Sequence, residues 1–267
     1  MSIDVEGLLA AFPPTVGRQS MDDAEVGETL HRILRALVRI DHLVIFAYRG
    51  KERPIDLYDT FNAQERIVFV TLYQAGPYLL DPFFHTAIQR RTGVFRMREL
   101  APDRFFSSEY HRTYYIQTGL AEEVGFFIPL DDEITVVLSL MRSEKTGPFP
   151  PSEFALIRKA EPLVSAMVRQ FWSQIAPRFD AAKTGKRRGR KAEASRPPVD
   201  TVWRDLNLTS REAAIVELVL QGHSSESIGL RLGISTGTVK VHRRNVYRKL
   251  GISSQIQLLS IYLERLE

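Results

Sequence analysis

The feature that most constrains this chain is the stretch 208–250, which divides into three short segments of helical character. Thr209 with Glu212 three residues later has the form of a capping box and predicts the start of the first helix. Gly222 and Gly233 follow the first two segments, and glycine adopts the left-handed conformation that ends many helices. The spacing therefore predicts three short helices joined by tight turns.

Apolar and cationic residues separate onto different sides of these helices. Ser224 or Ser225 is expected to begin the second helix and Ser235 the third. Apolar residues recur every three or four positions, which predicts an inward face. The inward set is Ile215, Leu218, Val219, Ile228, Leu232, Val239, Val246 and Leu250. The third helix keeps a basic outer face of Thr236, Lys240, Arg243, Arg244 and Arg248. Two short helices joined by a glycine turn, the second of them basic outside, predict a helix-turn-helix.

Three motifs in this stretch carry a resemblance to a known family. They are LTSRE at 208–212, IGLRLGIS at 228–235 and GTVKVHRRNVYRKLG at 237–251. With a closing helix near Ser253–Leu266, the last quarter of the chain resembles the LuxR/FixJ-type DNA-binding domain. Two positions depart from the family: Ser227 replaces the usual Glu, and Gly229 replaces the usual Ala. A glycine inside a helix costs up to about 1 kcal/mol of helix propensity.

The resemblance implies that the third helix reads the major groove of double-stranded DNA. Lys240, Val241 and Arg244 match base-contacting positions. Lysine or arginine can reach guanine O6 and N7, and valine can contact a thymine methyl group. The other residues of this site lead the basic stripe or are expected to contact phosphates. They are Thr236, Thr238, His242, Arg243, Arg248 and Lys249. A solvated basic helix face is the alternative.

Charge is unevenly distributed along the 267 residues, whose net charge is +4. Residues 203–267 hold nine Lys/Arg and six Asp/Glu, and residues 178–200 hold eight and three, so the rest is acidic. We expect a domain at 1–176, a basic flexible linker at 177–202 and the DNA-binding domain at 203–267. Within the linker, KRRGRK at 186–191 is either a solvated tether or a source of non-specific phosphate contacts.

The front domain alternates predicted helices with predicted strands. Helices are expected at 22–40, 62–73, 107–117 and 152–175, with another beginning at Asp81–Pro82; strands are expected at 42–48, 55–60, 92–97, 124–130 and 134–141. The fold class is therefore α+β: an α/β/α sandwich around an antiparallel sheet of the PAS or GAF type, followed by an all-α helix-turn-helix domain.

A second, more diffuse resemblance covers residues 20–175. Tyr78, the pair Asp81–Pro82, GVF at 93–95, TGLAEEVGFFIPL at 118–130 and LSL at 138–140 are similar to the autoinducer-binding domain of LuxR-type quorum sensors. The resemblance implies that Asp81 binds a ligand amide. The candidate ligand-binding residues are Tyr58, Tyr73, Tyr78, Asp81, Phe84, Phe95, Tyr110 and Tyr114. An apolar cavity with polar anchors is one reading. Ordinary aromatic core, with Asp81 capping a helix, is the other.

The tryptophans argue against a standard acyl-homoserine lactone. Both of them, Trp172 and Trp203, lie away from the expected pocket, and Phe95 stands where the family has a Trp. Phenylalanine lacks the indole N–H that would donate a hydrogen bond to a lactone carbonyl. We expect a different small-molecule effector.

The sequence motifs do not support a catalytic function. The histidines (His31, His42, His85, His111, His223 and His242) show no metal-ligand spacing, and no GxSxG, P-loop or GxGxxG motif is present. Asp22–Asp23 does not follow an apolar strand, as the acidic pair of a phospho-receiver would. We expect no catalysis, no metal and no cofactor. No signal peptide or membrane span is expected, and the absence of cysteine fits a cytoplasmic location.

These observations predict a LuxR-family transcription regulator that binds DNA as a homodimer. Dimerisation is expected through the first and last helices of the front domain and the closing helix. RNA polymerase is a further expected partner. Two hypotheses compete for the front domain. In one it binds a small-molecule effector that controls DNA binding. In the other it is a ligand-independent scaffold for dimerisation or protein interaction.

Overall fold

The computed structural model describes residues 3–11, 17–112, 118–131, 133–181, 203 and 206–265. They form two compact units. The sheet unit comprises 1–70, 83–99 and 119–191, and the helix-turn-helix unit comprises 71–82, 100–118 and 192–267, as far as each is described. Two segments from the front half of the sequence thus belong to the second unit, so the units do not follow the expected division at 176.

The sheet unit is organised around five antiparallel strands in the order β2-β1-β5-β4-β3. The strands are β1 (His42–Arg49), β2 (Ile55–Asp59), β3 (Gly93–Arg96), β4 (Leu120–Pro129) and β5 (Ile134–Ser143). Both expected hairpins, β1–β2 and β4–β5, are present. The central strand β5 is buried from Ile134 to Arg142, which explains its nearly continuous apolar sequence.

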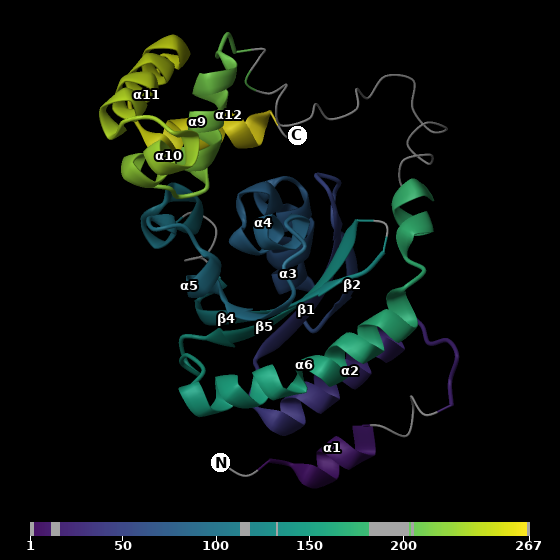
Figure 1. Ribbon diagram of the computed structural model, residues 1–267. Coiled ribbons are helices and arrows are strands. Elements are labelled where there is room, and N and C mark those ends of the chain that lie inside the picture. Colours follow the sequence, from purple (N-terminus) through teal and green to yellow (C-terminus); the bar gives the residue numbers. More distant parts are fainter. Residues whose placement is uncertain are drawn as a thin grey trace. The chain divides into compact units, whose positions relative to one another are not determined.

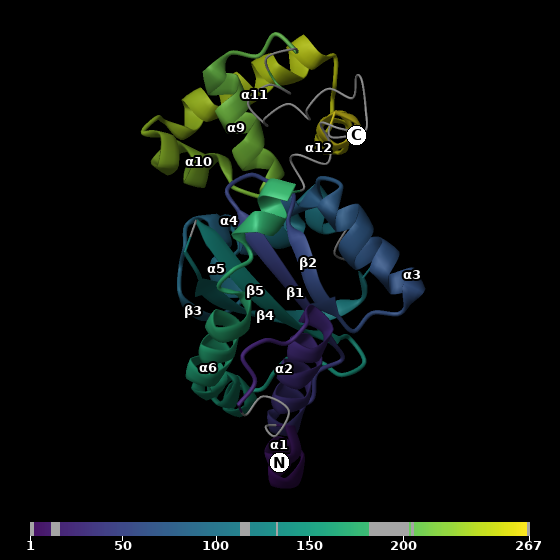
Figure 2. The same cartoon turned by 90° about the vertical axis from the view of Figure 1, so that its right-hand side faces the viewer.

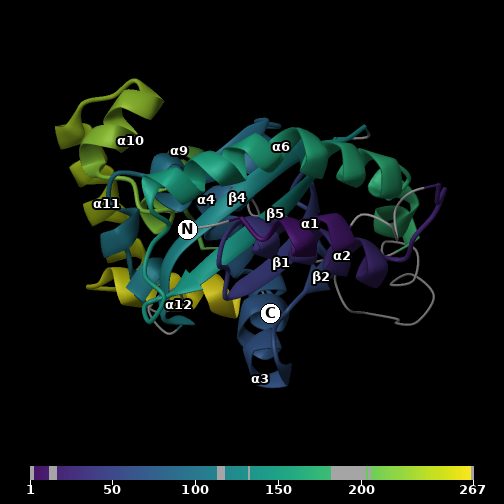
Figure 3. The same cartoon turned by 90° about the horizontal axis from the view of Figure 1, so that it is seen from below.

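Two long helices cover one face of this sheet, as Figure 1 and Figure 3 show. In α2 (Asp23–Leu37), Asp22 and Glu25 form a capping box. In α6 (Pro151–Trp172), Pro150 and Pro151 precede and begin the helix. A hydrophobic core of the unit joins α2 and α6 to apolar residues of the strands. The short α1 (Val5–Ala11) packs along α2.

The opposite face of the sheet carries an aromatic layer under α4 (Pro82–Ile88), seen above the strands in Figure 1. The ring centroids of Phe83 and Phe127 are 5.2 Å apart in an edge-on arrangement, and those of Phe84 and Tyr48 are 5.9 Å apart. Helices therefore lie on both faces, which confirms the expected α/β/α sandwich with an antiparallel sheet.

Several charged residues of the sheet unit are removed from solvent and are paired with other polar groups. Arg96 Nη1 lies 2.5 Å from Glu122 Oε1, and Arg142 pairs with Glu153, all four side chains being nearly inaccessible. Burial alone would raise the pKa of Asp41. Hydrogen bonds from Thr146 and Ser143 outweigh that effect and lower the pKa to about 2. Each of these charged groups thus has a partner, as partial or complete removal from water requires.

Several predicted boundaries need correction. The helix expected at 62–73 begins at Asn62 as expected, but its α-helical part, α3 (Ala63–Arg66), continues as a π-helix over Ile67–Leu72. The strand expected to reach residue 97 ends at Arg96, where α5 (Met97–Leu100) begins. For the helix expected at 107–117, positions 109–112 are helical and 113–117 lie outside the described residues.

The expected linker start at 177 is wrong. Residues 176–181 are helical, and both Ile175 and Phe179 are buried in the core shared with α2 and α6. The guanidinium of Arg49 lies 4.7 Å above the centre of the Phe179 ring and also contacts Asp180. These contacts attach the segment to the sheet unit. The remainder of the predicted linker, 182–202, lies outside the described residues.

Within the described residues 206–265, the helix-turn-helix unit contains four helices, which Figure 1 and Figure 2 show from two sides. They are α9 (Ser210–Leu220), α10 (Ser225–Leu232), α11 (Thr236–Leu250) and α12 (Gln255–Glu264). Trp203 is fully buried, and its ring stacks on Tyr262 of α12 with centroids 5.7 Å apart. In the part of the chain that the structure describes, no helix is both long and apolar enough to span a bilayer.

Candidate nucleic-acid interface

The helix-turn-helix is formed by α10, α11 and a turn with left-handed backbone. Ser224 caps α10 by accepting a hydrogen bond from the Ser227 amide, with N and Oγ 3.1 Å apart. Gly233 ends the helix at φ +64°, and the Ile234 amide then donates to the Gly229 carbonyl at 3.0 Å. These contacts are the capping serine and glycine stop that the sequence predicts.

The two departures from the family motif have structural reasons. A Cβ atom on Gly229 would lie only 2.7 Å from the carbonyl oxygen of Ile234, so the turn passes too close for alanine. The Ser227 hydroxyl lies 2.9 Å from Nδ1 of His223, the residue just before the cap. Burial lowers the pKa of His223 to about 4, so this imidazole is neutral near pH 7.

The outer face of α11 is positioned by its cap and its two inward valines. Ser235 accepts a hydrogen bond from the Thr238 amide at 3.0 Å, and Val239 and Val246 are completely buried. On the opposite side of α11, the exposed residues are Thr236, Lys240, Val241, Arg244 and Arg248. Half of the Val241 side chain's surface is accessible, which is unusual for valine. The three residues expected to contact bases therefore share one solvent-facing surface.

The remaining predicted DNA contacts are more constrained. Arg243 is half-buried, and its Nη1 donates to the Ser225 hydroxyl of α10 at 3.2 Å. His242 is half-buried, whereas Thr238 is exposed at the start of α11. Arg248 donates to the Asn245 side chain at 3.2 Å. All four side chains extend from α11, and their contacts with phosphates stay predictions.

Lys249 has a structural partner that the sequence reading missed. Its Nζ lies 2.6 Å from Oε2 of Glu212, the residue that completes the capping box of α9. Burial would raise the pKa of Glu212, but hydrogen bonds from Lys249 and Thr209 lower it instead. Lys249 therefore ties the end of α11 to the start of α9. Capping-box spacing is visible in sequence, whereas this pairing between helices is not.

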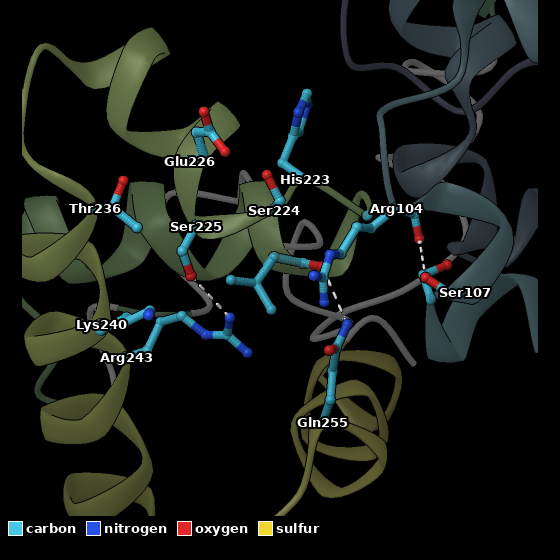
Figure 4. A pocket seen from close by; sticks show the side chains of 13 residues that line it. Arg104, Ser107, His223, Ser224, Ser225, Glu226, Thr236, Lys240, Arg243 and Gln255 are labelled. Carbon is cyan, nitrogen blue, oxygen red and sulfur yellow. Dashed lines mark hydrogen bonds between the residues drawn. The ribbon is translucent and has the colours of Figure 1, made fainter.

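A pocket of about 530 Å³ in the same unit adds residues that no motif indicated. Beside Thr236, Lys240 and Arg243 of α11, its lining includes Arg104 and Ser107, and Figure 4 shows these residues around one hollow. The other lining residues are Ser108, Val219, Gly222, His223, Ser224, Ser225, Glu226 and Gln255. Arg104 is far from α11 in sequence, so spacing along the chain gives no signal for it.

Three of the candidate ligand residues lie in the sheet unit, and they do not share a face. Phe84 belongs to the aromatic layer under α4, and the Phe95 ring lies edge-on to Phe127 in the same layer, with centroids 5.9 Å apart. Tyr58 instead faces α2, where its hydroxyl donates to Glu28 at 2.7 Å. The prediction that Tyr58 shares a ligand site with the other candidates is therefore wrong, because the sheet separates Tyr58 from Phe84 and Phe95.

The other candidates lie in the helix-turn-helix unit. The Tyr73 hydroxyl donates to Oδ2 of Asp81 at 2.6 Å, and both residues are buried. Tyr78 is also buried, with its ring centroid 6.3 Å from that of Tyr73. Tyr110 packs against Phe105 with centroids 6.1 Å apart. Tyr114 lies outside the described residues. The structure thus joins Asp81 to two of its predicted companions.

Among the residues that the structure describes, no group of three or more His, Asp or Glu side chains is arranged to hold a metal ion. The arrangement on α11 instead combines exposed cations with an exposed apolar side chain on a rigid helix. Such a surface can contact phosphates and base edges without covalent chemistry.

Known proteins share both this motif and much of the rest of the chain. The family model "Bacterial regulatory proteins, luxR family" matches residues 206–262. An HTH-type transcriptional regulator from the exeN 3′ region of Aeromonas salmonicida is 34% identical over 187 residues, which span 70% of this chain and 94% of that protein. The monoamine regulon transcriptional regulator of Klebsiella aerogenes is 24% identical, over 91% of this chain and 92% of its own.

A solved structure is also similar to a part of the chain. The VqsR LBD domain from Pseudomonas aeruginosa is 25% identical, covers 62% of this chain and 91% of its own, and gives a TM-score of 0.48. The family assignment follows from the matched helix-turn-helix and from the Aeromonas relative, which this chain covers nearly completely. The chain belongs to the LuxR family of bacterial regulatory proteins, whose members bind DNA and regulate transcription.

Proposed function

We propose that this protein regulates transcription as a homodimer, that α11 reads operator bases, and that a small molecule bound by the front domain controls DNA binding. The observation that carries the DNA-reading part is the outer face of α11, where Lys240, Val241 and Arg244 are exposed side by side. Lysine and arginine suit guanine, and valine suits a thymine methyl group, so the face matches a mixed-sequence site.

The test begins with an operator selected from a pool of randomised duplexes by the full-length protein. Lys240→Ala and Arg244→Ala are each expected to weaken operator binding by about 1–3 kcal/mol and to relax sequence preference at one base pair. Arg112→Ala, which removes an exposed cation of the same unit outside α11 and α12, serves as the matched control and should bind like the wild type. Unchanged affinity and preference in both α11 variants would contradict the assignment.

Dimerisation is supported by the small size of a single helix-turn-helix surface and by exposed apolar residues. Dimers of such motifs read paired half-sites and thereby gain affinity. The inner sides of α2 and α6, two of the helices expected at the interface, pack on the sheet, which leaves only their outer sides available. Ile256 on α12 is 55% exposed, as suits the proposed closing-helix contact. Light scattering on the full chain should give the mass of a dimer, and Ile256→Asp should lower it.

Control by a small molecule is supported by the buried polar pair of Tyr73 and Asp81. A buried carboxylate and a phenol hydrogen-bonded to each other provide the few oriented polar groups that ligand sites use. The effector is expected to differ from a standard acyl-homoserine lactone, because Phe95 cannot donate a hydrogen bond. Native mass spectrometry of the purified full chain should detect a co-purified molecule, which Asp81→Asn should release.

The scaffold hypothesis makes the opposite prediction for the same measurement. The aromatic layer formed by Phe83, Phe84 and Phe127 is already well packed within the sheet unit. A ligand-free protein that is fully folded and binds its operator would favour a front domain used only for dimerisation or protein interaction. RNA polymerase stays a predicted partner under either hypothesis.

A further inference from the structure

The pocket of about 530 Å³ joins the DNA-facing side of α11 to a segment from the front half of the chain. Lys240 and Arg243 reach it from α11, and Ser225 from the first turn of α10. Arg104 reaches it from the segment 100–118. In Figure 4 the side chains of Arg104 and Arg243 both point toward the middle of the hollow from different sides.

Specific backbone contacts hold this segment against the start of α10. The Arg104 amide donates to the Gly222 carbonyl at 2.9 Å, and the Ser224 amide donates to Oδ1 of Asp103 at 3.0 Å. Gly222 has φ +94°, and a Cβ atom there would lie 2.6 Å from Cα of Phe105. The turn therefore accepts the segment only because residue 222 is glycine. These contacts fix the backbone from which the Arg104 side chain extends.

The lining of the pocket is strongly cationic. Arg104, Lys240 and Arg243 contribute three positive charges against one negative charge from Glu226, which gives a net charge of +2. His223 is neutral near pH 7 and does not change this balance. The hydroxyl groups of Ser225 and Thr236 add hydrogen-bond donors, whereas the Ser107 hydroxyl donates to the Arg104 carbonyl at 3.1 Å. Arginine guanidinium groups and hydroxyls together are the donors that phosphate oxygens accept from in proteins.

We propose that this pocket binds a phosphate group of the DNA backbone and that Arg104 supplies a phosphate contact from outside the helix-turn-helix. The first helix of such a motif crosses the DNA backbone, and the pocket lies at the N-terminus of that helix, α10. The Ser224 amide at that N-terminus already donates to the Asp103 carboxylate, so the cations that line the pocket supply the attraction for the phosphate. The inference rests on the proposed function, because the phosphate belongs to the DNA that α11 reads.

The role of Arg104 predicts a particular salt dependence. A phosphate contact releases a counterion from DNA, so its loss weakens binding equally for all sequences and flattens the dependence of affinity on salt. With a short non-operator duplex, Arg104→Ala in the full chain should bind several-fold more weakly at low salt, with the logarithmic salt slope smaller in magnitude by about 1. Arg104→Lys, which keeps the charge, should retain most of the slope.

The matched control is Arg112→Ala. Arg112 lies on the same segment, is exposed and pairs with Glu109 at 3.3 Å, but it does not line the pocket. It should bind the duplex with wild-type affinity and slope. Tryptophan fluorescence of each variant should match the wild type, since Trp203 is buried against Tyr262 and reports folding of this unit.

Other outcomes separate this inference from the proposed function. If Arg104→Ala matches the wild type while Arg244→Ala weakens operator binding, the pocket assignment is overturned and the function of α11 stands. If neither variant changes DNA binding, the proposed function of α11 is contradicted, and the pocket assignment that rests on it is contradicted with it. Titration with inorganic phosphate distinguishes the source of the ligand: a loss of phosphate binding without any loss of duplex binding would overturn the DNA assignment. Tighter duplex binding by Arg104→Ala would overturn it as well, because the segment would then obstruct DNA.

Discussion

The sheet unit and the helix-turn-helix unit reach a defined structure in different ways. In the sheet unit, β1 lies beside β5, which pairs His42 with Met141 across a long stretch of chain. From α9 onward, the ends and turns of the helices are set by contacts three to five residues apart, such as the Ser224 and Ser235 caps and the bond from Ile234 to Gly229. The stability of a unit built on long-range pairing depends mainly on a large buried core. The stability of short helices with local caps depends more on a few specific residues.

The largest expected effect comes from the core of the sheet unit. Phe126 on β4 is completely buried in the core shared with α2 and α6. Phe126→Ala should lower the free energy of unfolding by about 3–5 kcal/mol, because it removes apolar contacts and leaves a cavity. Trp172, buried at the end of α6, is the reporter when Trp203 is replaced by phenylalanine.

The control for this change is Ile67→Ala, which alters a side chain of the same unit that is 55% exposed. Its effect should stay within about 0.5 kcal/mol. In protein whose only tryptophan is Trp203, Phe126→Ala should leave the unfolding midpoint almost unchanged. A midpoint that moves by the same amount for both tryptophans would show that the two units unfold together, and the contrast drawn between them would fail.

A smaller effect is expected from acid on the helix-turn-helix unit. The pKa of His223 is about 4 in the folded protein because burial disfavours the charged imidazole, and it returns to about 6.5 on unfolding. Between pH 6.5 and pH 4 the unfolded chain binds a proton at His223 and the folded chain does not. The contribution of neutral His223 to the free energy of unfolding is therefore fully present above pH 6.5 and is lost as the pH falls toward 4. The loss should reach about 2 kcal/mol near pH 5.

Urea unfolding monitored by Trp203 fluorescence, in a Trp172→Phe background, checks the prediction. His223→Gln removes the titrating group, so its stability should fall less between neutral pH and about pH 5 than that of the parent protein. His242→Gln on α11 is the control and should follow the parent. Equal acid sensitivity in all three proteins would show that carboxylates elsewhere, and not this imidazole, set the pH dependence of the unit.

The two units also differ in how far the sequence predicts them. The capping box at Thr209 and the apolar periodicity of the helix expected at 22–40 predicted elements that the structure contains, because these signals act over a few residues. The face of Tyr58 was not predictable: the β1–β2 register shifts between Ile45 and Phe46, and a one-residue shift changes which side a strand residue faces. The π-helix over Ile67–Leu72 has no evident cause in the sequence.

The residues of the candidate site also differ in how far the sequence predicts them. The exposed stripe of Lys240, Arg244 and Arg248 follows from helical periodicity alone. The partner of Lys249 and the position of Arg104 depend on contacts between segments distant in sequence, which no local pattern records. The sequence contains one sign of the position of Arg104, which is Gly222. A glycine at the end of a helix also permits another backbone segment to approach closely.

The smallest expected effect tests whether local rules suffice in the helix-turn-helix. Helix propensity alone predicts that replacing a helical glycine by alanine stabilises the protein by about 1 kcal/mol. Gly237 in α11 should follow that rule, because an added Cβ would meet only the Ser235 hydroxyl at an ordinary 3.6 Å. Gly229→Ala should instead destabilise the unit by about 1–2 kcal/mol, because its Cβ would lie 2.7 Å from the Ile234 carbonyl oxygen. Urea midpoints followed by Trp203 fluorescence measure both. Opposite signs at the two glycines would show that the turn geometry overrides propensity at 229, whereas stabilisation by both would mean that the turn yields and that local preference governs this unit throughout.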